Sequence, residues 1–447
     1  MILDRYPGLI LKRKPAARQR ANQPVEDKAL RVTLEIMGNL LGPTGLRRAN
    51  IRLWNGSYWP DSEPKPATFV LNRPSALREM LAGDSEACVV EAYLHGAFEV
   101  EGDMTAACDF ADVLDEQTFG WTKTLSTARQ LAQLPNTAAP ARTNWLRSVK
   151  LNGEKHSLGR DQRAIQFHYD VSNEFYALWL DPRMVYSCGY FQTADTSLEQ
   201  AQVDKLDLIC RKLDLRPGER LLDIGSGWGA LLLHAARHYG VQAEGVTLSQ
   251  RQFDWTVKRI EEESLGNRVK VRLCDYRALA DVEDYDKIAS VGMVEHVGTS
   301  RLPDYFKKVS TLLKPGGLFL NHGIGFGPRM RKNEKENFIE KFVFPDSELQ
   351  PIGLMLAAAG EAQFDVRDVE SLREHYAKTL RHWLTRLEDH HAEALVEVGE
   401  EAYRLWRLYL AGSAHGFQRA HLSVYQTLLA KTDAFGTARV PLTRANW

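Results

Sequence analysis

Cysteine is scarce in this sequence, and long apolar runs are missing. The five cysteines are odd in number and scattered, with no pair at metal-ligand spacing (Cys88, Cys108, Cys188, Cys210 and Cys274). This pattern disfavours a disulfide scaffold and a zinc site, and it fits free thiols in a reducing compartment. No apolar segment approaches the roughly 18 residues that a membrane-spanning helix needs. We therefore expect a globular protein of the cytoplasm without a bound metal ion.

An excess of charge of either sign is also missing. The 57 Lys and Arg residues balance 58 Asp and Glu residues, and the net charge is -1. A nucleic-acid partner is therefore not indicated. Two local basic clusters stand out. One lies in residues 1–20, which lack the apolar core of a secretory signal. The other comprises Arg329, Arg331, Lys332 and Lys335, followed by Phe338, Ile339, Phe342 and Phe344. Each is either solvated surface or a docking site for an anionic bilayer.

The length of 447 residues predicts two domains. Residues 1–133 show strand patterns at 67–71 and 97–101 and helical patterns around 28–42 and 104–133, which predict an α+β accessory domain. Residues 134–165 begin with a segment rich in proline and small residues, which predicts a linker. Residues 166–447 are the predicted catalytic domain.

Strands and helices alternate in the second region, which is typical of a doubly wound, Rossmann-like α/β sheet. Its strands are expected at 220–224, 242–246, 269–273, 287–291 and 318–321. Two helix starts are predicted from capping boxes, Thr196-x-x-Glu199 and Ser371-x-x-Glu374. In the second of these helices, Leu372, Tyr376, Leu380 and Trp383 share one face, so Tyr376 is expected to point inward.

A glycine-rich turn follows the first of these strands and includes Asp223, Gly225, Gly227 and Gly229. In a doubly wound sheet ligands bind at this edge, although a plain tight turn has the same pattern. The second strand ends in Gly245-Val-Thr-Leu-Ser249 and offers no acid for the ribose of a dinucleotide. Asp275 and Tyr276 follow the third strand and suit an adenine. These features favour S-adenosylmethionine over NAD.

Six motifs together resemble the cyclopropane fatty acid and mycolic acid cyclopropane synthases, class I methyltransferases that use S-adenosylmethionine. They run in the family's order through residues 166–430: His168-Tyr-Asp-Val-Ser-Asn173, Met184-Val-Tyr-Ser-Cys188, Leu222-Asp-Ile-Gly-Ser-Gly-Trp-Gly229, Val246-Thr-Leu-Ser249, Gly292-Met-Val-Glu-His-Val-Gly298 and Asn321-His-Gly-Ile-Gly325. The resemblance and the glycine-rich turn together predict a set of cofactor-binding residues: Tyr186, Ser187, Asp223, Gly225, Gly227, Gly229, Thr247, Leu248, Gln252, Asp275 and Tyr276.

The resemblance also implies a bound bicarbonate that acts as the base. Its ligands map onto Cys188, Glu295, His322, Ile324 and Tyr376. Judged alone, Glu295 is also explained as a helix-start carboxylate, and His322 and Tyr376 as hydrogen-bonded core residues. A covalent role for Cys188 is disfavoured, because a thiol nucleophile needs an activating neighbour and a sulfonium already leaves readily.

The implied activity is transfer of a one-carbon unit to the cis double bond of an unsaturated phospholipid acyl chain, which gives a cyclopropane. Loss of a different proton would leave a methylene or methyl branch, and Val294 stands where many relatives have phenylalanine. A methyltransferase for small amines or phenols and a silent lipid-binding protein are weaker alternatives. The expected location is peripheral, on an anionic bilayer at the inner face of the membrane. The acyl position, the headgroup and a homodimeric state stay open.

Overall fold

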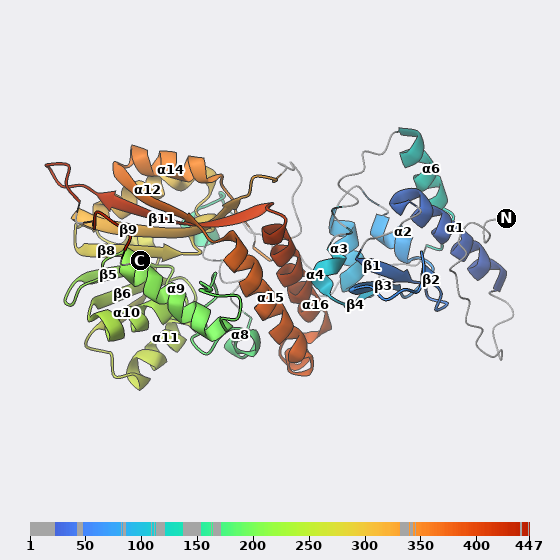
Figure 1. Cartoon of the computed structure of the whole chain (residues 1–447), viewed down its shortest axis with the longest axis horizontal. Helices are drawn as coiled ribbons and strands as arrows, with labels where there is room; N and C mark the ends of the chain where they lie inside the picture. Colours follow the sequence, from blue (N-terminus) through green and yellow to red (C-terminus); the bar gives the residue numbers. More distant parts are fainter. Residues whose placement is uncertain are drawn as a thin grey trace. The chain divides into compact units, whose positions relative to one another are not determined.

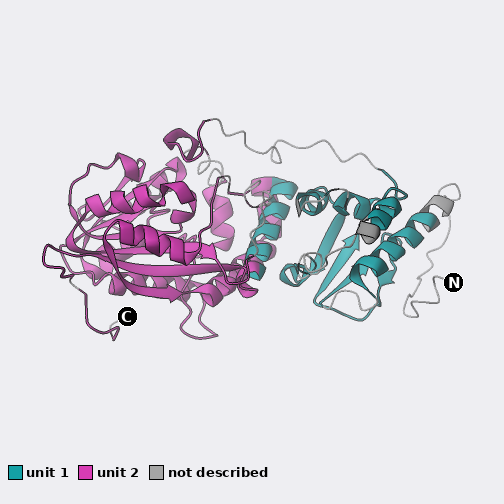
Figure 2. Cartoon of the chain, turned by 90° about the horizontal axis from the view of Figure 1, so that it is seen from above, with its two compact units in different colours: residues 1–147, 334–338, 399–415 teal, residues 148–333, 339–398, 416–447 magenta. Residues whose placement is uncertain are grey.

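The computed structural model describes residues 23–42, 48–81, 83, 86–108, 110, 112, 121–136, 153–161, 163, 171–330, 339, 343–344, 346–438, 440–445 and 447. The chain forms two compact units (Figure 2). We call residues 1–147, 334–338 and 399–415 the accessory unit. Residues 148–333, 339–398 and 416–447 form the sheet unit.

These units differ from the ranges expected from sequence. Residues 153–161, expected in the linker, pack in the sheet unit, whereas residues 399–415 pack in the accessory unit. The second difference has a local cause in helix α16 (His391–Gln418). This helix is interrupted at Gly399, which has φ 75° and ψ 169°. Beyond that point Arg404 donates to the backbone oxygen of Tyr93 at 3.0 Å and pairs with Glu99.

The accessory unit has the predicted α+β character. Its four-stranded sheet has the order β2-β1-β3-β4, with β1 parallel to β3 and the other pairs antiparallel. The strands are β1 (Ala49–Arg52), β2 (Tyr58–Trp59), β3 (Ala67–Leu71) and β4 (Phe98–Gly102). Side chains alternate between buried and half-buried along β3, as a one-sided sheet requires. The helices are α1 (Gln23–Leu41), α2 (Ala76–Leu81), α3 (Glu86–Leu94), α4 (Met104–Ala107) and α6 (Trp121–Leu131).

The sheet unit is built on a seven-stranded sheet of order β10-β11-β9-β8-β5-β6-β7. The strands are β5 (Arg220–Ile224), β6 (Gln242–Thr247), β7 (Val269–Leu273), β8 (Tyr285–Val291), β9 (Leu313–Phe326), β10 (Phe364–Ser371) and β11 (Leu422–Lys431). The five from β5 to β9 are parallel, and β11 runs antiparallel to both β9 and β10. The doubly wound α/β prediction is therefore confirmed, with two antiparallel strands added at one edge.

Helices cover both faces of this sheet. Figure 1 shows α12 (Leu302–Leu312) and α14 (Ile352–Glu361) on one face and α10 (Ala230–Tyr239) and α11 (Gln250–Glu262) on the other. One apolar cluster joins α10 and α9 (Leu198–Lys212) to the sheet, and a second joins α12 and α14 to it. The remaining helices are α8 (Asn173–Trp179) and α15 (Arg373–Asp389). Among the helices that the structure describes, none is long and apolar enough to cross a membrane.

Two helix starts differ from the predicted capping boxes. Helix α9 is capped by Ser197, whose side chain accepts from the backbone N–H of Gln200 at 3.2 Å, and not by Thr196. Helix α15 begins after Leu372 and has no side-chain cap. The hydroxyl of Ser371 lies 3.4 Å from that of Ser423 across the β10–β11 ladder instead. The predicted inward face of α15 is confirmed, because Leu372, Tyr376, Leu380 and Trp383 are all buried.

Candidate active site

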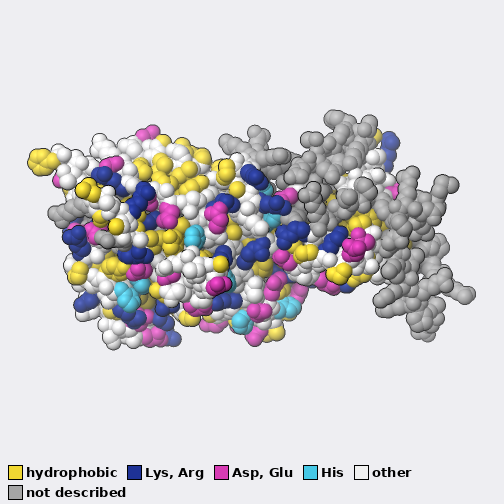
Figure 3. All heavy atoms as spheres, viewed as in Figure 1, with side chains coloured by type: hydrophobic (Ala, Val, Ile, Leu, Met, Phe, Trp, Pro, Cys, Tyr) yellow, Lys and Arg dark blue, Asp and Glu magenta, His cyan; other side chains and the backbone are white. Residues whose placement is uncertain are grey.

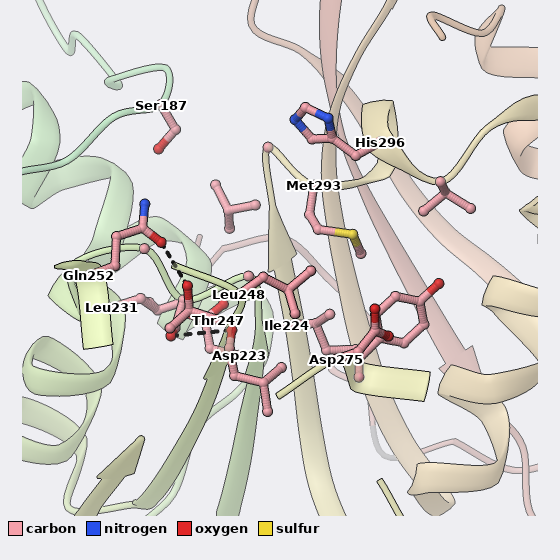
Figure 4. Close-up of a pocket in the computed structure, with 18 of the residues that line it drawn as sticks. Ser187, Asp223, Ile224, Leu231, Thr247, Leu248, Gln252, Asp275, Met293 and His296 are labelled. Atoms are coloured by element: carbon pink, nitrogen blue, oxygen red, sulfur yellow. Dashed lines mark hydrogen bonds between the residues drawn. The ribbon is translucent and has the colours of Figure 1, made fainter. Parts of the chain in front are cut away.

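A cavity opens at the carboxyl ends of the parallel strands of the sheet unit. Ten of the eleven residues predicted to bind the cofactor line it, and Gly229 is the exception. Figure 4 shows Ser187 and Gln252 on one side of the cavity, Asp275 on the other, and Met293 and His296 above them. The ten are Tyr186, Ser187, Asp223, Gly225, Gly227, Thr247, Leu248, Gln252, Asp275 and Tyr276.

The glycine-rich turn after β5 supplies the floor of this cavity. Gly225, Gly227 and Gly229 have φ values of 80°, 53° and 83°, in the left-handed region that favours glycine. A Cβ on Gly227 would meet no described protein atom within 4 Å, so it would project into open space of the cavity. A Cβ on Gly229 would lie 2.5 Å from Cγ2 of Thr256. Gly229 therefore has a structural reason to be glycine, because it starts α10 against α11.

Polar groups at the end of β6 are held in place by one another. The Thr247 hydroxyl donates to Oε1 of Gln252 at 2.7 Å and accepts from the N–H of Ser249 at 3.2 Å. Figure 4 shows the Gln252 amide nitrogen directed away from Thr247, toward Ser187. This side of the cavity thus offers an oriented amide donor.

The opposite side is closed by an ion-pair network that the sequence analysis did not predict. The Asp275 carboxylate accepts from Nε of Arg277 at 2.9 Å and from its terminal nitrogen at 2.7 Å. Arg277 also donates to the backbone oxygen of His156 at 3.2 Å and to Asp161 at 2.9 Å. Asp275 therefore orients Arg277 as well as facing the cavity, and Arg277 holds residues 153–161 against it.

The five residues predicted to hold the base do not line this cavity, but strand register gathers them at the same edge of the sheet. His322 pairs with Val291 of β8 and Gln426 of β11, and Ile324 pairs with Val424. The Ile324 N–H donates to Oε1 of Glu295 at 2.7 Å.

Cys188 and Tyr376 lie at the same edge of the sheet, where both contact the backbone of Leu372. The Leu372 carbonyl accepts from the Tyr376 N–H at 3.0 Å and lies 3.7 Å from the Cys188 sulfur. The Leu372 N–H donates to the carbonyl of Val424 at 2.9 Å. The Tyr376 ring packs against Trp383 and Phe417, with centroids 6.0 and 4.7 Å away. All five predicted positions are therefore linked through β9, β11 and the start of α15.

Two buried polar atoms in this group have no hydrogen-bond partner among the described residues. These are Oε2 of Glu295 and Nε2 of His322. Burial raises the pKa of the Glu295 carboxyl to about 7 and lowers the pKa of His322 to about 3. His322 is therefore neutral. Its Nδ1 lies 3.2 Å from Nε2 of Gln426, and if that amide donates, the proton of the imidazole is on Nε2. An acceptor and a donor then remain for a small polar molecule.

Burial also dominates the electrostatics of the other residues in this region. It raises the pKa of the Cys188 thiol, which is thus a poor nucleophile. It raises the pKa of Asp223 to about 7, with the charge of Lys205 acting in the opposite direction. Oδ1 of Asp223 has no partner among the described residues. Lys205, which sequence reasoning overlooked, is fully buried and lines the cavity.

Comparison with known proteins identifies the family of this chain. Residues 156–427 match the family model described as mycolic acid cyclopropane synthetase. The chain belongs to this family. A probable fatty acid methyltransferase of Pseudomonas putida is 39% identical over 88% of the chain and 94% of its own length. A probable fatty acid methyltransferase of Mycobacterium tuberculosis is 37% identical over 85% of the chain and 88% of its own length.

Two solved structures of the family each match 60% of this chain. The cyclopropane synthase MmaA2 of Mycobacterium tuberculosis has a TM-score of 0.58 and 34% identity, covering 60% of this chain and 98% of that one. The mycolic acid cyclopropane synthase CmaA1, complexed with SAH and CTAB, has a TM-score of 0.57 and 33% identity over 60% of this chain and 98% of that one. The resemblance inferred from the six motifs is therefore confirmed.

Proposed function

We propose that this enzyme transfers a one-carbon unit from S-adenosylmethionine to the cis double bond of an unsaturated phospholipid acyl chain and forms a cyclopropane. The observation that supports this most is the joint placement of the glycine-floored cavity and the buried, unpartnered atoms of Glu295 and His322 at one edge of the sheet. A sulfonium methyl is already activated, so the protein mainly has to position it and exclude water. An alkene is a weak nucleophile, and its attack leaves a cation that must lose a proton.

Bicarbonate fits the two unpartnered atoms, and we propose it as the base. When bound, it would supply an oxygen that accepts the proton lost after methyl transfer. Oε2 of Glu295 would accept from its hydroxyl, Nε2 of His322 would donate to an oxygen, and the chain around Cys188, Ile324 and Tyr376 would enclose it. Turnover should therefore fall in bicarbonate-free buffer and return when bicarbonate is added back.

A branched product is the second candidate. Two relatives that match 88% and 85% of this chain are named probable fatty acid methyltransferases. Val294 is buried, and its Cγ1 would lie 2.3 Å from a Cβ on Gly323, so it packs tightly beside the predicted base site. Deprotonation of a chain carbon, in place of the added methyl, would leave a methyl branch beside a double bond of the chain. A methylene branch would form if a hydride of the chain first shifted to the cation and the added methyl then lost its proton.

We also propose that the enzyme docks on the inner face of the membrane, because its phospholipid substrate lies there. The predicted basic and aromatic cluster lies mostly outside the described residues, as does the N-terminal one. Over the face shown in Figure 3, the described basic and acidic side chains are interspersed. Attraction to anionic lipid is worth about 1 kcal/mol per Lys or Arg. Changing Arg329, Arg331, Lys332 and Lys335 together to glutamine should weaken sedimentation with anionic vesicles and leave cofactor affinity unchanged.

Mass spectrometry tests the function directly. The purified enzyme, S-adenosylmethionine and vesicles of a mono-unsaturated phospholipid should give acyl chains heavier by one CH2. A cyclopropane and a methylene branch are isomers, and NMR separates them, because ring methylene protons and vinyl protons resonate far apart. Vesicles that gain no carbon, under conditions in which the enzyme binds S-adenosylmethionine, would contradict the proposed substrate.

A further inference from the structure

Lys205 is a buried cation without a matching anion. It lies on α9, is 2% exposed, and lines the cavity. Its ammonium donates to the Ser187 hydroxyl at 2.8 Å. Among the described residues no carboxylate lies within ion-pair distance of it. Lys212, two turns further along the same helix, is buried with Asp368 at 3.4 Å and Glu370 at 2.5 Å. One helix thus holds two buried lysines, of which only one is neutralised.

An uncompensated buried ammonium is costly. Burial accordingly lowers the pKa of Lys205 to about 8, although the more distant Cys188, Asp181 and Asp223 act in the opposite direction. The ammonium has three N–H groups, and one bond to Ser187 leaves capacity for another acceptor. Because Lys205 borders the cavity, an anionic group of the ligand can reach that capacity.

The position of Lys205 in the cavity indicates which end of S-adenosylmethionine would lie near it. Its partner Ser187 lies across the cavity from Asp275 in Figure 4, and Asp275 and Tyr276 are the residues expected to face an adenine. The far end of S-adenosylmethionine is an amino acid with one ammonium and one carboxylate. Asp223 presents a buried oxygen without a partner among the described residues, and Lys205 presents the complementary charge.

We propose that Lys205 binds the α-carboxylate of S-adenosylmethionine, while Asp223 accepts from its α-ammonium. This inference rests on the proposed use of S-adenosylmethionine. It adds a binding residue outside the glycine-rich turn, one that recognises the amino-acid end of the methyl donor.

Calorimetric titration with S-adenosylmethionine and with decarboxylated S-adenosylmethionine tests the assignment. A hydrogen bond between charged groups corresponds to a preference of about ten-fold or more. The wild type should show that preference for the carboxylated ligand. Lys205→Met should bind both ligands with similar affinity, and Lys205→Arg should retain part of the preference. Lys212→Met is the matched control and should keep the wild-type ratio.

The outcomes separate this inference from the proposed function. A wild type that binds neither ligand would contradict the proposed function itself. A wild type that binds both equally would overturn the role of Lys205, even if the variants failed to fold. If Lys205→Met kept the wild-type ratio of the two affinities, Lys205 would not contact the carboxylate. If Lys212→Met lost the preference for the carboxylated ligand to the same extent, the loss would come from altered helix packing. Either result would also overturn the inference.

Discussion

Replacing Glu295 with glutamine should make the stability of the folded protein less sensitive to rising pH. It should also lower turnover. The carboxyl is 6% exposed, and burial raises its pKa from 4.5 to about 7. Between these two values the folded chain holds a proton that the unfolded chain has released, so wild-type stability falls as the pH rises through this window. Glutamine has no such proton, and its oxygen can still accept the Ile324 N–H. The decline in stability with rising pH should therefore be specific to the wild type.

The magnitude follows from the pKa difference. At about 1.36 kcal/mol for each pH unit, the complete effect is about 3 kcal/mol, of which about 1 kcal/mol is already present near pH 5. Between about pH 5 and about pH 8, the free energy of unfolding of the wild type should fall by about 2 to 3 kcal/mol relative to Glu295→Gln. Urea denaturation at both pH values measures this difference. Turnover of Glu295→Gln should fall by about 100-fold or more, on the usual scale for a general base, because the variant would no longer hold the bicarbonate that we propose as the base.

Glu348→Gln is a control with the opposite sign. Burial raises the pKa of Glu348, but hydrogen bonds from Lys155 and Thr299 outweigh it and lower the pKa to about 2. Stability from Glu348 is complete above its ordinary pKa of 4.5 and is lost as the pH falls toward 2, so between pH 5 and pH 8 this variant should differ from the wild type only through His156, whose pKa Glu348 helps to raise. Parallel curves for wild type and Glu295→Gln would refute the assigned environment of Glu295, and full turnover of Glu295→Gln with the same product would refute its role.

Four further substitutions have separate readouts. Gly227→Val should abolish S-adenosylmethionine binding in calorimetry, because its Cβ would project into the cavity, while circular dichroism shows the sheet retained; valine is strained at a φ of 53°, so the melting temperature should fall somewhat. Native affinity would show that the loop is only a turn. Gly229→Val should lower the melting temperature further, because its Cβ would also collide with Thr256. Tyr376→Phe should lower turnover less than Glu295→Gln and leave cofactor affinity alone, so a large loss of affinity would contradict its placement. Arg277→Met should speed hydrogen exchange in residues 153–161, since four side-chain hydrogen bonds to His156, Asp161 and Asp275 are lost; unaltered exchange would show that other contacts hold the segment.

Most of the parallel strands were predictable because their buried residues form short apolar runs after clear turns. Strand β7, in which only Val269 is buried, was instead marked by the alternation of apolar and basic residues in Val269-Lys-Val-Arg-Leu273. Strands β10 and β11 escaped prediction for physical reasons. Most side chains of β10 are exposed or half-buried, so it shows no regular alternation. Strand β11 is buried on both faces, yet Gln426 and Thr427 interrupt its apolar run.

The cofactor residues were found because the motifs place them directly after strands. The contacts of Arg277 with residues 153–161 were not predictable, since they join positions more than a hundred residues apart in the chain. Lys205 left a faint signal: Gln202, Lys205, Ile209 and Lys212 recur at helical spacing, and all four are buried. A polar residue on the core-facing side of a predicted helix is thus worth considering as a ligand contact.

The interruption of α16 at Gly399 bears on how far this protein can be divided. Residues 399–415 belong to the accessory unit, although the chain enters and leaves them from the sheet unit. A cut in the segment around residues 137–152 would therefore leave a fragment that still contains Arg404 but has lost Glu99 and the backbone of Tyr93. The accessory unit therefore cannot be removed by one cut in the chain. Either half expressed alone would expose residues whose hydrogen-bond partners lie in the other half.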